Sequence, residues 1–298
     1  MIELWVIALR GVQYVAIAIA LGLPAFMLYN PAVRAMALVW PRRMVLAAAL
    51  VLLAAAPAAL VAQTAMMAGS LEAALSPDAL RAVISLPLGM AILVRAVGAA
   101  LLVIVVAAFS PERVLWLAAA VIAALINATF VWTSHAGATG FLPLLLSDGV
   151  HLLAASIWIG ALAAFAGIMF WRPADSSARL WPLITALARF ARVGTFAVLL
   201  LIGTGLINGV MLIGFENMLM LAETPYGRTL IAKLALFAMR LALAGANRFR
   251  LAPALAAVGK DATDTPLRML RLSIGLELAA GVTLLALVAV LGTLPPPS

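Results

Sequence analysis

Long apolar runs separated by short polar breaks make up most of the chain. A hydrocarbon core of about 30 Å needs roughly 20 apolar residues for each helical crossing. Eight runs reach this length, and we expect transmembrane helices over residues 4–29, 44–67, 87–109, 114–134, 149–171, 193–214, 229–247 and 272–292. A β-barrel would instead show alternating segments of about ten residues. The pattern therefore predicts an all-α, polytopic integral membrane protein with about eight transmembrane helices.

The composition supports this class and limits the domain organisation. Apolar residues make up 66% of the 298-residue chain and charged residues only 10%, which excludes a soluble domain with an ordinary surface. No break is long enough to hold a soluble domain, so we expect a single transmembrane domain over residues 1–298. Glu3 and the absence of a basic segment before the first run favour a retained helix over a signal peptide. The chain contains no cysteine, so thiolate metal sites are excluded.

Basic residues alternate between the breaks and predict the orientation. Thirteen of the nineteen fall in breaks on one side, namely Arg34, Arg42, Arg43, Arg113, Arg172, Arg179, Arg189, Arg192, Arg248, Arg250, Lys260, Arg268 and Arg271. Breaks rich in Arg and Lys stay in the cytoplasm, so both termini should be periplasmic. The net charge of +8 then reflects contact with anionic lipid, and no aromatic-basic pattern indicates nucleic acid.

Small residues in two helices indicate close packing. Gly205 and Gly209 are four residues apart in the sixth helix, and Ser156, Gly160 and Ala164 repeat at the same spacing in the fifth. Such spacing lets two helix backbones approach one another. The alternative is that small residues are simply common in these helices.

Both histidines of the chain lie in one short stretch. We expect His135 to end the fourth helix, residues 136–147 to form an outer loop, and Asp148 and His151 to begin the fifth helix on one face. Imidazole with carboxylate suits Cu(II), and imidazole with thioether suits Cu(I). Methionines near the same face, Met218 and Met220 among them, are further candidate ligands.

Two tryptophans, Trp132 and Trp158, share helical faces with His135 and His151 and are expected to wall this site from lipid. The alternative is a structural one. The two histidines would then only hydrogen-bond to backbone or headgroups, and the methionines would be apolar filler.

Five charged residues lie inside the predicted helices, where an ionisable group costs at least about 2.5 kcal/mol to insert. They are Arg10, Arg95, Lys233, Arg240 and Glu277. The first three should snorkel or bind loop carbonyls near the outer face. Arg240 and Glu277 reach a similar depth, which predicts a direct salt bridge; a cation path through Glu277 is the alternative.

Several motifs together resemble the CopD family of copper-resistance inner-membrane proteins. They are SHA at 134–136, D-x-x-H followed by A-x-x-x-W-I-G at 148–160, G-T-G-L-I-N at 203–208, Y-G-R-T-L-I-A-K at 226–233 and N-R-F at 247–249. The resemblance implies an eight-helix protein of the bacterial inner membrane that takes copper from the periplasm. It also implies work with a separate periplasmic copper-binding protein of the CopC type, and it points to His135, Asp148 and His151 as copper-site residues.

The expected function is copper transport or acquisition, with no catalytic site and no enzymatic activity. Copper would be accepted at the periplasmic His/Asp site, with methionine as a further ligand type, and passed inward. One alternative is a membrane b-type cytochrome, in which the two histidines would ligate one haem. Another is a copper-binding assembly factor that does not transport.

Overall fold

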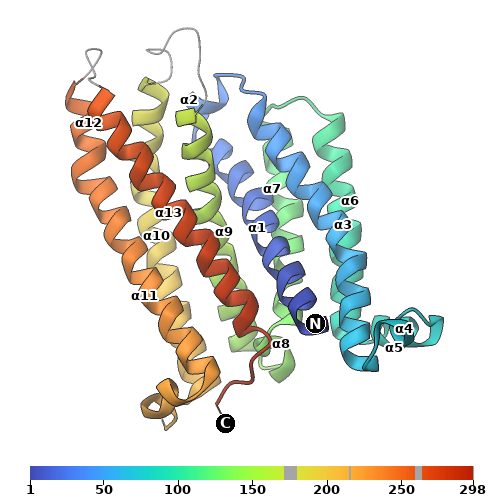
Figure 1. Ribbon diagram of the computed structural model, residues 1–298. Helices are drawn as coiled ribbons and strands as arrows, with labels where there is room; N and C mark the ends of the chain where they lie inside the picture. The colour runs from blue at the N-terminus through green and yellow to red at the C-terminus, as the bar shows by residue number, and fades with distance from the viewer. Residues whose placement is uncertain (171–179, 215, 259–263, 298) are drawn as a thin grey trace.

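The computed structural model describes residues 1–170, 180–214, 216–258 and 264–297, and these residues form helices and turns without a β-strand. Eight helices or helix combinations are long and apolar enough to cross a membrane, as expected. The long helices are α1 (Ile2–Tyr29), α3 (Trp40–Ala68), α6 (Pro87–Ala108), α7 (Arg113–Ala128), α9 (Leu142–Phe170), α10 (Leu180–Ile213), α11 (Pro225–Ala246) and α13 (Asp264–Leu291). They run roughly along one direction as a bundle (Figure 1).

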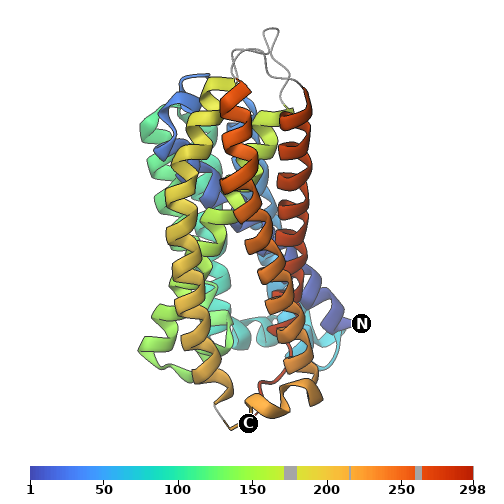
Figure 2. The ribbon, with the colours of Figure 1, turned by 90° about the vertical axis from the view of Figure 1, so that its left-hand side faces the viewer.

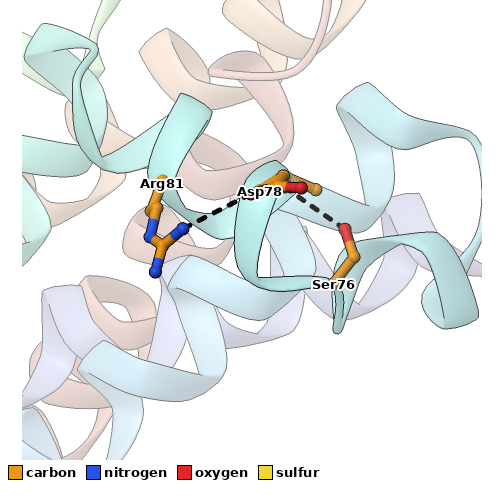
Figure 3. Close-up of polar contacts among 4 residues, drawn as sticks. Ser76, Asp78 and Arg81 are labelled. Atoms are coloured by element: carbon orange, nitrogen blue, oxygen red, sulfur yellow. Dashed lines mark hydrogen bonds and ion pairs between the residues drawn. The ribbon is translucent and has the colours of Figure 1, made fainter.

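Short helices fill most of the connections. They are α2 (Pro31–Arg34), α4 (Leu71–Ala74), α5 (Pro77–Ile84), the 3₁₀ helices η1 (Val131–Thr133) and η3 (Met218–Glu223), α8 (His135–Thr139), the π-helix η4 (Asn247–Leu251) and α12 (Ala252–Val258). Ser76 caps α5, because its Oγ accepts from the amide of Ala79, and Asp78 pairs with Arg81 one turn on (Figure 3).

Three helices begin at least seven residues earlier than the apolar pattern predicts. The fifth transmembrane helix, α9, begins at Leu142 instead of residue 149, so Asp148 and His151 lie about two to three turns inside it. The predicted loop over 136–147 is therefore wrong: α8 and the first turn of α9 occupy most of it. Similarly, α10 begins at Leu180 and α13 at Asp264. In the early parts of α10 and α13, Arg189 and Arg268 suit the membrane interface, where long basic side chains bury their stems and keep their charge in water.

The first helix, α1, is central and packs against α3, α7, α9 and α13. Its crossing with α9 is tight, since a Cβ built on Gly160 would overlap the backbone of Gly22. Ser156 is buried, and Ala164 is fully buried on the same helix. The close packing predicted for the fifth helix is thus confirmed. In α10, by contrast, Gly209 faces open space and Gly205 lies near His151.

Both chain termini and α8 lie at one end of the bundle, and α2 and α12 lie at the other (Figure 1). Arg34 and Arg248, on α2 and η4, belong to the set of basic residues expected in the cytoplasm. We call the end with the termini and α8 the outer end. Its periplasmic orientation stays a prediction.

Candidate metal site

His135 is the first residue of α8, and Ser134 caps that helix by accepting from the amide of Gly137. The His135 Nε2 lies 3.1 Å from the carbonyl oxygen of Leu291, at the end of α13. A carbonyl only accepts, so Nε2 carries the proton and Nδ1 keeps its lone pair. His135 is thereby oriented by backbone, with one ring nitrogen left to bind another group.

Asp148 faces His135 across a small cavity at the outer end. The Ser134 hydroxyl donates to the Asp148 Oδ2 at 2.7 Å, which ties α9 to the start of α8. His135 and Asp148 both line a cavity of about 110 Å³, together with Tyr226 and Lys233 of α11. The rings of His135 and Tyr226 meet edge to face, with centroids 6.1 Å apart. The cavity therefore joins one imidazole and one carboxylate from different elements.

His151 lies one turn deeper on α9 and has a different partner. Its Nδ1 is 2.8 Å from the Thr204 Oγ1 of α10. The Thr204 hydroxyl hydrogen is directed at the Leu200 carbonyl, 2.5 Å away, so Thr204 accepts from His151. The Nδ1 of His151 is then protonated and its Nε2 keeps the lone pair. His151 does not line the cavity of His135 and Asp148.

The predicted convergence of two imidazoles and a carboxylate at one point is not found. Among the residues that the structure describes, no group of three or more His, Cys, Asp or Glu side chains is close enough to hold a metal ion. The reason is that Thr204 holds the His151 ring toward α10. The two tryptophans do not wall the site either. Trp132 is 52% exposed, and Trp158 is buried further along α9 beside Phe237.

The two candidate methionines, Met218 and Met220, belong to η3, which precedes α11. Their side chains lie outside the part of the chain that is described, so their candidacy as ligands stays a prediction. The end of η3 packs close to the start of α11, where a Cβ on Gly227 would overlap the Leu221 carbonyl.

Arg10 and Arg95 donate hydrogen bonds to neutral groups near the outer end. Arg10 donates to the carbonyl of Thr133 at 2.7 Å, which is the loop-carbonyl contact that we expect. Arg95 is only 3% exposed and donates to Gln13 and to the hydroxyl of Thr129, at the end of α7. A cation at a helix C-terminus is favoured by the helix dipole. Lys233, the third charge of this group, lines the outer cavity.

The predicted salt bridge between Arg240 and Glu277 is wrong. Within the described residues, the only ion pair within 4.0 Å joins Arg81 to Asp78. Both groups instead contact Trp158: its Nε1 donates to the Glu277 Oε1 at 2.8 Å, and the Arg240 guanidinium lies 4.5 Å from the ring centroid. The second oxygen of Glu277 accepts from the Asn247 Nδ2 at 3.0 Å. The charges are thus linked through an indole.

Sequence reasoning missed the polar partners that orient these groups. Ser134 and Thr204 position the site residues, and Trp158 and Asn247 hold Glu277. A signal existed for Ser134, because a serine followed by a short helical segment is a common N-cap. The roles of Thr204, Trp158 and Asn247 depend on helix rotation, which apolar runs do not define.

Comparison with known proteins places the chain in a family. The model of the family described as "Copper resistance protein D-like, N-terminal domain" matches residues 1–144, and that of "Copper resistance protein D" matches residues 184–291. The chain belongs to the copper resistance protein D (CopD) family. With its eight apolar spans, it is a multi-pass protein of the inner membrane, in contact with the lipid bilayer.

Three curated relatives resemble the chain. Copper resistance protein D of Pseudomonas syringae pv. tomato is 36% identical over 174 residues, which cover 57% of this chain and 56% of the relative. Copper transport protein CutJ of Bacillus subtilis (strain 168) is 32% identical over 51% of this chain and 26% of the relative. Inner membrane protein YebZ of Escherichia coli (strain K12) is 29% identical over 50% of this chain and 48% of the relative.

The matched segments thus span about half the length of two of these relatives and about a quarter of CutJ. No solved structure matches the chain. The names of the relatives support a copper-related membrane function for the family.

Proposed function

We propose that this protein accepts copper at the outer cavity between His135 and Asp148 and passes it to His151, as the first steps of transport inward. The observation that carries the proposal is the state of the two imidazoles. In each, one ring nitrogen is hydrogen-bonded to a carbonyl or hydroxyl oxygen, and the other ring nitrogen has no hydrogen bond among the described residues. Metal-binding histidines are oriented in this way, by a hydrogen bond on the nitrogen that does not bind metal.

The arrangement favours successive transfer over one closed cage. Asp148 and His151 are three residues apart on α9, so they share a helical face, with His151 one turn deeper. Lys233 lines the same cavity as Asp148 and repels a cation that stays there. A site with few ligands and a nearby positive charge suits an ion that has to leave again.

Metal analysis of the purified protein after loading with Cu(I) or Cu(II) tests the proposal. His135→Ala and His151→Ala should each remove most bound copper, and Asp148→Asn should weaken Cu(II) more than Cu(I), because a hard oxygen ligand is lost. Tyr226→Phe is the matched control, since it keeps a ring beside His135 and removes only a hydroxyl. Stoichiometric copper in the folded double histidine variant would overturn the assignment.

Transport itself is tested by uptake of isotopic copper into sealed vesicles that contain the protein. Uptake that depends on His135 and His151 supports a transporter. Stoichiometric binding without any uptake would support the alternative of an assembly factor. The direction depends on the predicted topology, and a periplasmic reporter that is active when fused after residue 180 would contradict that topology.

We also propose that copper arrives from a separate periplasmic protein of the CopC type. Residues of α8 and of the end of α13 line the outer cavity, and these segments lie at the end of the bundle that carries the termini (Figure 1), where such a donor would have access. Mixing a copper-loaded donor with this protein and separating the two would measure transfer. Loss of transfer in His135→Ala, with the donor still loaded, is the expected result.

A b-type cytochrome is less well supported by the geometry. The cavity at His135 measures about 110 Å³, below the roughly 300–1,000 Å³ of ordinary ligand pockets, and His151 is turned toward Thr204. A Soret band in the purified protein that disappears in His135→Ala and His151→Ala would establish the haem alternative.

A further inference from the structure

A second, larger cavity lies in the half of the bundle away from the termini. Its volume is about 500 Å³, within the range of small-molecule pockets. It lies between α10, which packs along α9, and α11, which packs along α13. Figure 2 faces these two helices, with α12 beside α10 at the upper end. We call it the inner cavity.

Apolar and aromatic side chains line most of the inner cavity. Trp158 and Phe165 of α9, Phe190 of α10 and Phe249 of η4 contribute rings. The rings of Phe165 and Phe190 meet edge to face, with centroids 5.4 Å apart. Imidazole and thioether groups are missing from the described residues of this lining, so the cavity is unsuited to copper. An occupant of this cavity would therefore differ from the cargo proposed for the outer site.

The deep end of the cavity carries hydrogen-bond acceptors. Glu277 is 1% exposed, and each of its oxygens accepts one bond, from Trp158 or from Asn247. The Oδ1 of Asn247 is buried and has no partner among the described residues. A buried acceptor without a donor costs about 1–3 kcal/mol. Asn247 and Glu277 both line the cavity, so an occupant with a donor would satisfy this oxygen.

The backbone supports a functional role for this end. Asn247 begins the π-helix η4, and π-helical turns occur frequently at functional sites. The next residue, Arg248, donates to Thr195 and to the carbonyl of Ala191 on α10, at 3.2 Å for the carbonyl. These bonds join η4 to α10 across the lining of the cavity.

The charge around Glu277 favours a neutral donor over a cation. Arg240 already lies 4.5 Å from the Trp158 ring that holds Glu277, so one positive charge accompanies the carboxylate. A second cation would be left without an anion among the described lining residues. A neutral hydroxyl on an aromatic ring satisfies both the acceptors and the aromatic walls.

We propose that the inner cavity binds a membrane-soluble phenol or hydroquinone, with its ring against the aromatic walls and one hydroxyl donating to the Oδ1 of Asn247. The proposal concerns binding alone. It is independent of the copper site, because it shares no residue with the outer cavity.

The test compares 4-hexylphenol with 4-hexylanisole, in which a methyl group replaces the hydroxyl hydrogen and so removes the donor, on the purified full-length protein in nanodiscs. Affinity is measured by native mass spectrometry and by thermal stabilisation. The anisole should bind roughly tenfold more weakly or worse, since it leaves the Oδ1 of Asn247 without a donor.

Gly245 offers a variant that fills the cavity and leaves its polar end intact. Gly245 lines the inner cavity, and a Cβ there meets open space, so Gly245→Phe enters the cavity without a backbone clash. Gly203→Phe is the matched control, because Gly203 also faces open space but lies outside the lining. Gly245→Phe should abolish phenol binding, and Gly203→Phe should retain it.

Three outcomes would overturn the proposal. Equal binding of the anisole would indicate a purely apolar occupant such as a lipid chain. Undiminished phenol binding by Gly245→Phe would place the ligand elsewhere. If neither probe binds, the inner cavity is not a binding site for phenols. Copper binding, measured in parallel, should be unchanged by Gly245→Phe, which keeps this test separate from that of the outer site.

Discussion

The two sides of α9 are packed in opposite ways. Toward α1, Gly160 meets Gly22 so closely that no Cβ fits between the two backbones. Toward α11, the same helix borders the inner cavity of about 500 Å³, where Gly245 faces open space. Lipid tails are as apolar as leucine, so tight contact of small residues is what joins helices in a membrane.

The two sides of α9 therefore have different roles. The tight side fixes the height and rotation of α9, and with them the positions of Asp148, His151 and Trp158. The open side holds the buried charges and the space for a ligand. Four substitutions, from the largest expected effect to the smallest, test this division.

Glu277→Leu should be the most destabilising. It leaves Arg240 buried without the carboxylate that accompanies it, and breaking such an arrangement costs about 3–5 kcal/mol. Unfolding of the purified protein in detergent, followed by circular dichroism, measures the loss. The double variant Glu277→Leu with Arg240→Leu should recover part of the lost stability. Native stability in Glu277→Leu would show that the charges are not coupled through Trp158.

Gly160→Leu should cost about 3 kcal/mol, the upper end of ordinary overpacking, because the side chain has to separate α9 from α1. The same unfolding measurement applies. Gly209→Leu is the control, since a Cβ at Gly209 meets nothing within 4 Å. If both variants are equally stable, the α1 contact does not fix α9.

Trp158→Phe should cost about 2 kcal/mol, because Glu277 loses a hydrogen bond from the indole while the ring that faces Arg240 remains. Trp132→Phe serves as the control at a half-exposed tryptophan. A loss in Trp158→Phe no larger than in the control would contradict the role of the indole N–H.

Gly245→Ala should have the smallest effect and the opposite sign. Alanine in a helix interior is favoured over glycine by about 0.5–1 kcal/mol, and the cavity accommodates the methyl group without a clash. An increase in the unfolding midpoint is expected. A decrease would indicate that the cavity closes in the native protein.

The helices were largely predictable from the sequence, because the hydropathy of a segment indicates whether that segment can cross a bilayer. The eight spans are confirmed, and the errors concern helix starts such as Leu142 and Leu180. An apolar run ends at the first charged residues. The helix itself continues into the membrane interface, because its backbone hydrogen bonds do not depend on apolar side chains.

The site was less predictable, because apolar runs define the depth of a residue but not the rotation of its helix. Depth alone suggested a direct pair of Arg240 and Glu277, although the two are linked through Trp158. Asp148 and His151 were correctly placed on the fifth transmembrane helix, but only Asp148 lines the outer cavity. The orientation of the His151 ring depends on Thr204, from a helix more than fifty residues later.

The length of α10 links the inner cavity to the thickness of the bilayer. Its 34 residues extend for about 51 Å at 1.5 Å per residue, some 20 Å more than the hydrocarbon core. The apolar run of α10 begins at residue 193, so we expect its first turns, which line one end of the inner cavity, at headgroup level, and Glu277 in the middle of α13 within the hydrocarbon. Hydrophobic mismatch would consequently act on this cavity: a thinner membrane exposes its mouth to water, and a thicker one submerges it in lipid.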